Sequence, residues 1–317
     1  MEDFRGLTWK QLRALSATVD AGSVTGAAKT LFVTPPAITI QLKQLEASVG
    51  APLFDRSTPH FTPTEIGAEL VDVAHDFERR ITRAAERIAA LRAGAAGSIV
   101  FGVVSTAKYL APSIVAGFRA THPGIRVKLV IGNRGEIVRA LERNEFDILL
   151  MGRPPAHVAV ESEVMGDHPH VLVAPPSHRL VGDPEILAED LLHERFLGRE
   201  PGSGTRTLME RFLDRFGGGR PFEVVEMGSN ETIKQSVMAG LGLAVISAHT
   251  CLAELAEGKL VALPVIGLPL VRQWFLLNPA DRKPTKAVEI FRAYVAEHRQ
   301  SLFPQIAPDS FRPRRAG

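Results

Sequence analysis

The sequence predicts an α/β protein with an all-α N-terminal part, and three observations support that fold class. Segments with helix-capping signals follow one another closely between residues 8 and 49. Residues 65–92 contain no proline and carry apolar residues at helical spacing, which predicts a single long helix. From residue 98 onward, strand-like apolar segments alternate with helical ones, as they do in α/β domains.

Length and composition narrow the class of protein. A chain of 317 residues exceeds what one hydrophobic core usually supports, so several domains are expected. With 45% hydrophobic and 23% charged residues the composition is globular, and a net charge of +2 excludes a bulk polycation. Cys251 is the only cysteine, so an intrachain disulfide and a cysteine-built zinc site are both excluded. We expect Cys251 to be a small buried hydrophobe.

The N-terminal segment and the hydropathy pattern bear on location. The segment MEDFRGLTWK lacks a basic region followed by an apolar one, so we expect no signal peptide. No uninterrupted apolar run approaches the roughly 20 residues that a membrane-spanning helix needs. We therefore expect a cytoplasmic protein with no membrane partner.

The N-terminal part predicts three short helices. Thr8 with Gln11 three positions later is a capping-box signature, and it opens a helix that ends at Gly22. Ser23 then caps a second helix. Thr34 is predicted to cap a third helix, whose first two positions are prolines that need no amide hydrogen there. Two short helices, a tight turn and a third helix in this order predict a helix-turn-helix.

The third helix has two faces of different character. At about 100° per residue, four apolar side chains share one face: Ile38, Leu42, Leu45 and Val49. The opposite face carries small, apolar and amide groups with a single lysine: Pro36, Ile40, Lys43 and Ala47, flanked by Thr39 and Gln44. This composition suits the major groove of DNA, where Thr39 and Gln44 bond to base edges and Ile40 contacts a thymine methyl. An ordinary helical hairpin with an exposed isoleucine is the alternative.

A turn-rich segment and a long helix follow. Residues 50–64 predict a small β-hairpin or wing, which completes a domain over residues 1–64. Residues 65–93 form the predicted long helix. Its apolar residues recur at separations of three and four, as in a heptad seam: Leu70, Val73, Phe77, Ile81, Ala84, Ile88 and Leu91. A lone helix cannot bury such a stripe, so we expect a second copy of the chain to pack on it. Packing on its own winged domain alone is the alternative.

The region after a small-residue hinge at residues 94–97 is predicted to form two α/β lobes. Strands are expected near residues 98–104, 125–131, 147–151, 170–174, 195–198, 222–227, 243–247 and 270–277. Helices between most of them predict mainly parallel sheets covered on both faces. The region, residues 98–304, is large for one sheet, so we expect a cleft between two lobes. Lobe I comprises residues 98–168 and 272–304, lobe II residues 169–271, and a disordered tail follows at 305–317.

Polar and basic residues follow the predicted strand ends, where open α/β sheets bind ligands. Arg134 and Arg153 each follow a strand, and residues 202–205 precede a helix whose first amides would face the cleft. The candidate ligand residues are Ser105, Thr106, Lys108, Arg134, Arg153, Arg199, Glu200, Ser203, Gly204, Thr205, Arg206, Asn230, Glu231 and Thr232. So many basic side chains favour a ligand with phosphate or carboxylate groups, selected by bidentate arginine contacts. The alternative is that several of these arginines form interlobe salt bridges or surface pairs.

Motifs that would indicate catalysis are missing from the sequence. The segment GSGTR lacks the lysine and the spacing of a P-loop, and no nucleophile elbow, zinc-protease helix or dinucleotide fingerprint is present. His168 and His170 flank Pro169 without a third ligand at metal spacing, so structural or hinge roles are expected for them. We therefore expect no enzyme and no metal. An α/β enzyme acting on a phosphorylated ligand and a plain solute-binding protein are the alternative classes.

One continuous pattern covers about 60 residues: AGSVTGAAKTLFVTPPAITIQLKQLEASVGAPLFDRS, followed by TPTEIG. It resembles the N-terminal signature of LysR-type transcriptional regulators. The resemblance implies that the third helix enters the major groove, the wing approaches the minor groove and the long helix makes a dimer. The implied DNA-binding residues, taken with the face analysis, are Ser23, Thr25, Thr34, Pro35, Pro36, Ala37, Thr39, Ile40, Gln41, Lys43, Gln44 and Arg56. Pro35 and Ile40 depart from the glutamine and arginine common at these positions, so no operator sequence carries over.

Segments of the α/β region show a second resemblance: VVSTAKYLAP, GNR, MGRPP, HPHVLVAPPSH, REPGSGTR and GSNETIKQSVMAGLG. They are similar to the LysR-type regulators of RuBisCO and Calvin-cycle operons (CbbR-type), whose effector domain has the two-lobed fold of periplasmic binding proteins. This similarity implies control of carbon-fixation genes by a sugar phosphate or NADPH, with no other cofactor. A LysR-type regulator of another operon with a carboxylate effector is the alternative. The expected partners are operator DNA, further copies of the chain in a dimer or tetramer, a small anionic metabolite and RNA polymerase.

Overall fold

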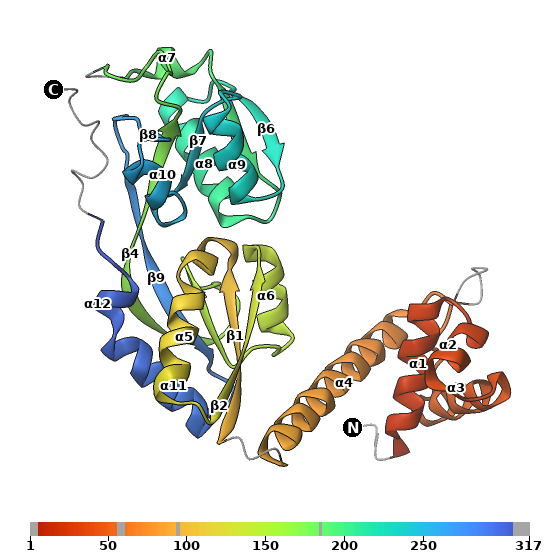
Figure 1. Cartoon of the computed structure of the whole chain (residues 1–317). Helices are drawn as coiled ribbons and strands as arrows, with labels where there is room; N and C mark the ends of the chain where they lie inside the picture. Colours follow the sequence, from red (N-terminus) through yellow and green to blue (C-terminus); the bar gives the residue numbers. More distant parts are fainter. Residues whose placement is uncertain (1–5, 56–60, 93–95, 184–185, 307–317) are drawn as a thin grey trace. The chain divides into compact units, whose positions relative to one another are not determined.

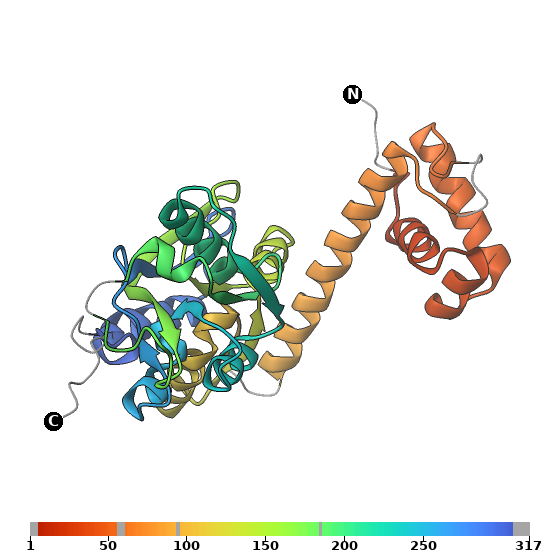
Figure 2. The ribbon, with the colours of Figure 1, turned by 90° about the horizontal axis from the view of Figure 1, so that it is seen from above.

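The computed structural model describes residues 6–55, 61–92, 96–183 and 186–306. The chain divides into two compact units, Met1–Ala89 and Ala90–Gly317, so the division falls inside the long helix. Figures 1 and 2 show the helical first unit in red and orange and the mixed α/β second unit in the remaining colours. No helix in the described ranges is long and apolar enough to cross a membrane. Half of the predicted hinge at residues 94–97 and most of the predicted tail at 305–317 lie outside these ranges.

The helix-turn-helix predicted from the sequence is present in the first unit. It consists of α1 (Trp9–Ala21), α2 (Val24–Leu31) and α3 (Pro35–Val49). The capping box of Thr8 and Gln11 forms as predicted, and the Ser23 hydroxyl accepts a bond from the Gly26 amide at 3.0 Å. Gly22 ends α1 in the left-handed conformation, which glycine adopts without strain.

The start of α3 differs from the prediction in one respect. Thr34 occupies the N-cap position with an extended backbone, but its side chain makes no capping hydrogen bond. A capping hydroxyl bonds to the amide hydrogen of the second or third helical residue. Pro36 has no such hydrogen, and the Ala37 amide donates to the Thr34 carbonyl instead, at 3.0 Å. The Thr34 hydroxyl is therefore left on the exposed surface.

The predicted apolar face of α3 closes the core of the first unit. Its four members, Ile38, Leu42, Leu45 and Val49, are buried together with apolar side chains of α1 and α2. The predicted wing is represented by one antiparallel bridge between Phe54 and Pro63, with residues 56–60 outside the described ranges. Leu53, just before this bridge, is fully buried in the same core and so ties the wing to the helices.

The long helix α4 (Glu65–Arg92) leaves most of its apolar stripe uncovered within one chain. Val71 is buried in the core of the helix-turn-helix, and Leu70 packs against it. Five members of the predicted seam are instead between 44% and 61% exposed: Val73, Phe77, Ile81, Ile88 and Leu91. Packing on its own domain therefore does not account for this stripe, which has the length and spacing that a second helix would cover.

The second unit contains a seven-stranded sheet of order β2–β1–β3–β9–β4–β7 with β8 beside β4, and a second sheet of β5 and β6. The strands are β1 (Gly97–Val104), β2 (Ile125–Gly132), β3 (Ile148–Met151), β4 (Val160–Ala174), β5 (Arg195–Arg199), β6 (Glu223–Met227), β7 (Ala244–Ser247), β8 (Val261–Ala262) and β9 (Leu270–Pro279). The helices are η2 (Ser105–Tyr109), α5 (Ala111–Thr121), α6 (Arg134–Glu142), α7 (Ala188–Leu191), α8 (Gly204–Gly217), α9 (Asn230–Met238), η3 (Ala248–Thr250), α10 (Leu252–Ala256), α11 (Lys286–Glu297) and α12 (Arg299–Leu302).

The prediction of mainly parallel sheets is wrong for the larger sheet. β1 pairs in parallel with β2 and β3, but β9 runs antiparallel to both β3 and β4, and β4 runs antiparallel to β7. The strand predicted near residues 170–174 is the last part of β4, which begins at Val160. Gly166, at which a bulge interrupts the ladder, and Pro169 are residues that usually end strands, and they concealed the first part of β4.

The two lobes have separate cores joined by β4 and β9. Met165 and Trp274 belong to the core of lobe I, whereas Val171 and Leu172, further along β4, belong to cores of lobe II. Figure 1 shows β4 in green and β9 in blue running side by side from one lobe to the other. Residues on this stretch of the two strands therefore lie at the junction of the two lobes.

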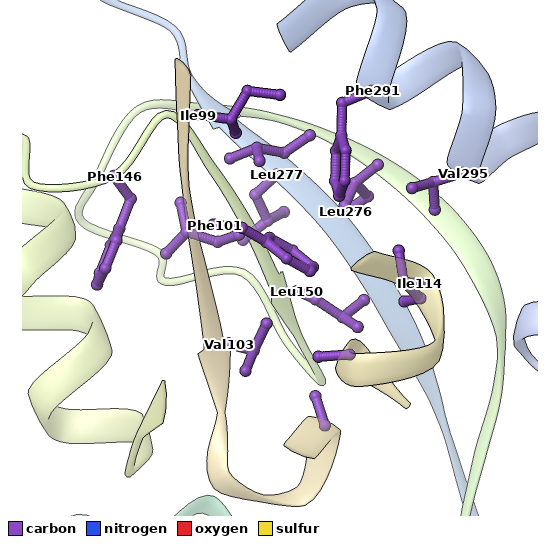
Figure 3. Packing of buried hydrophobic residues seen from close by; sticks show 14 of the residues in the cluster. Ile99, Phe101, Val103, Ile114, Phe146, Leu150, Leu276, Leu277, Phe291 and Val295 are labelled. Carbon is purple, nitrogen blue, oxygen red and sulfur yellow. The ribbon is translucent and has the colours of Figure 1, made fainter. Parts of the chain in front are cut away.

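Phe101 on β1 lies in the middle of the lobe I core and supports a test of that core. It is fully buried, its ring centroid is 5.1 Å from that of Phe291, and Figure 3 shows it among the side chains of β1, β3, β9 and α11. Phe101→Ala is expected to destabilise the protein by about 3–5 kcal/mol, because the surrounding side chains cannot fill the space. Urea unfolding followed by fluorescence measures this. The exposed residue Ile266 provides the control, and equal midpoints for Phe101→Ala and Ile266→Ala would contradict the expectation.

Candidate functional site

A cavity of about 270 Å³ lies between the two lobes in the described part of the second unit. Its lining comes from the segments after β1 and β3, the start of α6, the first turns of α8, and the strands β4 and β9. The lining residues are Val104, Ser105, Thr106, Arg134, Gly152, Arg153, Pro154, Ala156, His168, His170, Ser203, Gly204, Thr205, Thr207, Leu208, Arg211 and Arg272. The carboxyl ends of parallel strands such as β1 and β3 are where α/β sheets bind ligands.

The lining contains half of the ligand residues predicted from the sequence. These seven are Ser105, Thr106, Arg134, Arg153, Ser203, Gly204 and Thr205. The other seven do not line the cavity: Lys108, Arg199, Glu200, Arg206, Asn230, Glu231 and Thr232. The first set follows strand ends or opens a helix, while most of the second set is engaged in contacts with other protein groups.

The charge of the lining is strongly one-sided. It carries four arginines, Arg134, Arg153, Arg211 and Arg272, and no aspartate or glutamate among the residues described. Burial lowers the pKa of Arg134, and the charges of Arg153 and Arg272 lower it further. Burial likewise lowers the pKa of Arg272, helped by Arg153 and Arg211. The four guanidinium groups therefore repel one another, and an anion in the cavity would relieve that repulsion.

A helix N-terminus adds to this positive potential. α8 begins at Gly204, and Ser203 occupies its N-cap position without a side-chain capping bond. Ser203 and Thr205 are both buried on the cavity lining. The first amides of a helix carry partial positive charge and lack partners within the helix, so they bind phosphate or carboxylate groups. The N-terminus of this 14-residue helix and the four arginines share the cavity lining, an arrangement that favours a small anion over a neutral ligand.

Arg199, predicted as a ligand contact, does not line the cavity and is engaged by protein groups. It is buried, and its Nε and Nη2 donate to the two carboxylate oxygens of Glu200 at 2.7 and 2.8 Å. Its Nη1 donates to Asn230 at 2.8 Å and, across the lobes, to the Ser105 hydroxyl at 3.2 Å. Glu200 in turn accepts a bond from Asn133 of lobe I at 3.3 Å. Four of the five N–H groups of Arg199 thus donate to protein oxygens, and the bond to Ser105 connects lobe II to lobe I.

The remaining predicted ligand residues also have protein partners. Lys108 of lobe I pairs with Glu231 of lobe II at 2.5 Å, and the Tyr109 hydroxyl donates to the same carboxylate. Arg206 pairs with Glu210 and with Glu226, each at 2.7 Å, on the surface of lobe II. These pairs match the alternative that several basic residues form interlobe or surface contacts. Thr232 and Asn230 belong to the first turn of α9, where Ser229 caps the Thr232 amide.

Sequence reasoning missed the residues that β4 and β9 contribute to the cavity. His168 and His170 lie two apart on β4 and therefore share one face, and His168 is paired in register with Arg272 of β9. The sequence predicts structural or hinge roles for His168 and His170, and it does not indicate which strand pairs with them. Arg211 lies two turns into α8 on the side that faces the cavity. No group of three or more metal-binding side chains occurs among the described residues.

The buried histidines give the second unit a predictable dependence on pH. Burial lowers the pKa of His170 from 6.5 to about 4. Between these values the unfolded chain takes up a proton that the folded chain does not, so stability is lost as the pH falls from 6.5 toward 4. We expect about 1.4 kcal/mol per pH unit from this residue. Urea midpoints at pH 7 and pH 5 measure the loss, and His170→Asn should show a smaller one. Equal losses in the two proteins would contradict the assignment.

The candidate DNA-binding residues form an exposed surface on the first unit. Exposed members are Thr25, Thr34, Pro35, Pro36, Thr39, Ile40, Lys43 and Gln44, while Ser23, Ala37 and Gln41 are half-buried. Ile40 is 53% exposed although it is apolar. The Thr39 hydroxyl donates to the Pro35 carbonyl at 3.2 Å, which leaves its lone pairs available. Arg56 lies outside the described residues, so its predicted contact stays a prediction.

One feature of this surface was not predicted. Phe32, in the turn between α2 and α3, is 95% exposed and has a positive φ of 56°. Its neighbour Val33 is also exposed, so an apolar edge adjoins the exposed face of α3. A run of Leu31, Phe32 and Val33 in the sequence gives no indication of which members point outward, because the turn breaks the helical period.

Comparison with protein families identifies both units. Residues 9–68 match the model of the bacterial regulatory helix-turn-helix protein, lysR family. Residues 92–300 match the model of the LysR substrate binding domain. The chain belongs to the LysR family of transcriptional regulators. This membership confirms the predicted fold class, a winged helix-turn-helix followed by a long helix and a two-lobed α/β effector domain. It also makes the chain a DNA-binding transcriptional regulator rather than an enzyme.

Relatives of this LysR-family chain match it over nearly its whole length. The HTH-type transcriptional regulator CbbR of Xanthobacter flavus is 45% identical over 300 residues, which is 94% of this chain and 90% of the relative. The RuBisCO operon transcriptional regulator of Acidithiobacillus ferrooxidans is 40% identical over 291 residues, 92% of this chain and 94% of the relative. The solved CcmR regulatory domain of Synechocystis PCC6803, in complex with 2-PG, is 32% identical with a TM-score of 0.60. It covers 63% of this chain and 96% of that domain.

Proposed function

We propose that this LysR-family regulator binds a small anionic metabolite in the cavity between its lobes and that this ligand is its effector. The observation that supports the proposal is the lining itself, which has four arginines, one helix N-terminus and no carboxylate among the described residues. Neutral ligands would leave the repulsion between these arginines in place. A ligand with phosphate or carboxylate groups would replace it with charge-assisted hydrogen bonds.

The proposed effector is a phosphorylated metabolite, with sugar phosphates and NADPH, which the resemblance to CbbR-type regulators implies, as the first candidates. A related regulatory domain was solved with 2-PG, which adds that compound to the candidates. We propose RuBisCO-operon genes of carbon fixation as the target, since relatives 40–45% identical are named as CbbR and as RuBisCO operon regulators. Family membership alone would leave the target operon open.

The first unit is proposed to contact operator DNA through the exposed face of α3. Thr39, Gln44 and Ile40 are the proposed contacts to bases, and Lys43 the proposed contact to phosphate. The exposed stripe of α4 is proposed to form the interface of a homodimer, within a dimer or a tetramer. The protein would act in the cytoplasm, and RNA polymerase is the further partner expected of a transcriptional regulator.

Titration calorimetry on the full-length protein tests the effector proposal. The ligands are 2-PG, a sugar bisphosphate, NADPH, inorganic phosphate and a neutral aromatic compound of similar size. We expect measurable binding of at least one phosphorylated metabolite and none of the neutral aromatic. Tighter binding of the neutral compound than of every anion would overturn the proposal.

A further inference from the structure

His168 is held rigidly at the boundary of the cavity. It lies on β4, is 4% exposed and belongs to the cavity lining. Its ring stacks on that of Trp274 of β9, with centroids 3.7 Å apart and an angle of 14° between the planes. Stacking fixes the orientation of the imidazole, so its two nitrogens point in defined directions.

One of these nitrogens is bonded to Ser247, at the end of β7. The distance from His168 Nε2 to the Ser247 hydroxyl oxygen is 2.9 Å, and both residues are buried. In the described part of the chain this is the sole hydrogen bond of the Ser247 hydroxyl. The distance fits either direction of the bond, but only donation by Ser247 gives its buried hydroxyl hydrogen an acceptor, so we infer that Ser247 donates to Nε2. Nε2 is then the acceptor, and the single hydrogen of the neutral imidazole resides on Nδ1.

The other nitrogen, Nδ1, is buried and has no hydrogen-bond partner among the described residues. Among the residues with such unpartnered atoms, His168 is the one that lines the cavity. Gly152, also on the lining, lies beside it, and a Cβ at that position would come within 3.2 Å of Nδ1. With glycine at position 152, no side chain crowds Nδ1 from this part of the lining. A buried donor without an acceptor is unfavourable, which makes a ligand atom the natural partner.

We propose that His168 donates a hydrogen bond through Nδ1–H to an oxygen of the effector and so helps to select its chemistry. The inference rests on the proposed function, because it assigns a role within the same cavity. An effector with a phosphate, carboxylate or carbonyl oxygen at this position satisfies the donor. A compound that presents a donor or an apolar group there leaves Nδ1–H unpaired and is disfavoured, by about tenfold or more.

The tautomer of His168 provides the first test. Long-range proton–nitrogen spectra of full-length protein labelled on histidine distinguish Nδ1–H from Nε2–H forms, and a His168 variant assigns the signal. We expect the Nδ1–H form in the free protein and a clear shift of its Nδ1 resonance when 2-PG is added. An Nε2–H form in the free protein would overturn the inference even if no ligand binds. An unchanged Nδ1 resonance, where calorimetry shows that 2-PG binds, would overturn it while leaving the proposed function intact.

Two variants separate recognition by Nδ1 from structural support. His168→Asn places an amide on the same carbon that carries Nδ1, whereas the amide of His168→Gln lies nearer the position of Nε2. Both variants lose the stacking on Trp274, and only His168→Gln keeps a polar group near Ser247, so a merely structural role would make His168→Gln the equal or better binder. We expect His168→Asn to bind 2-PG at least about tenfold more tightly than His168→Gln, a difference of about 1.4 kcal/mol. Equal affinities of the two variants would overturn the inference.

Discussion

Replacing Arg272 by glutamine is expected to weaken the binding of a phosphorylated effector by about 10- to 100-fold while leaving the free protein at least as stable. Arg272 lies on the cavity lining, and burial together with Arg153 and Arg211 lowers its pKa. Removing one of four like charges relieves repulsion in the free protein, but removes a charge-assisted bond from the complex. The opposite signs of these two effects distinguish a ligand-binding arginine from a structural one.

Calorimetry with 2-PG or another phosphorylated metabolite gives the affinity, and thermal unfolding gives the stability. Arg206→Gln is the matched control, because it removes the same charge from an arginine outside the cavity that pairs with Glu210 and Glu226. We expect this control to keep its affinity. A variant at Arg272 that loses stability and binds the effector as tightly as the unmodified protein would contradict the assignment.

Replacing Ile40 by glutamate is expected to reduce operator affinity by about 100-fold or more without unfolding the first unit. Ile40 is exposed near the middle of the proposed DNA-contacting face of α3. A carboxylate there would face the phosphates and base edges of the groove, and it would lose contact with a thymine methyl. Because the side chain does not take part in the core, the helix itself should tolerate the change.

Gel retardation of a promoter fragment enriched from genomic DNA by the unmodified protein measures this affinity. Ser48→Glu adds the same charge to the same helix at an exposed position two turns further along and about 80° around the helix from Ile40. The control should lose much less affinity, about tenfold at most. Equal losses for the two variants would show that the exposed face of α3 is not the surface that meets the groove.

The helix-turn-helix could be predicted closely because its determinants are local in sequence. The capping box of Thr8 and Gln11, the buried face of α3 and the terminal glycine of α1 each depend on residues within one or two helical turns. The one local error, the side-chain cap of Thr34, arose because the two prolines also remove or redirect the amides that a cap requires.

The cavity could be predicted only in part because its determinants are distant in sequence. Arg199 and Arg272 are alike as residues, but Arg199 is paired with its neighbour Glu200 and with Asn230, while Arg272 lines a cavity whose described residues include no carboxylate. The pairing of β4 with β9 decides which side chains reach the site. A periodic pattern within each strand cannot predict the register between two strands that are about 100 residues apart in sequence. His168 was noted in the sequence and still could not be placed.

An anion bound in the arginine-lined cavity is expected to change how this regulator occupies DNA. Nuclease footprinting on the enriched promoter fragment, with and without the metabolite that binds in calorimetry, tests it most directly. We expect the footprint of the unmodified protein to change in length at saturating ligand, because effector binding shifts the equilibrium between conformations of the regulator. The footprint of the Arg272→Gln protein should stay unchanged at the same concentration. An identical footprint of the unmodified protein with and without saturating ligand would contradict the claim.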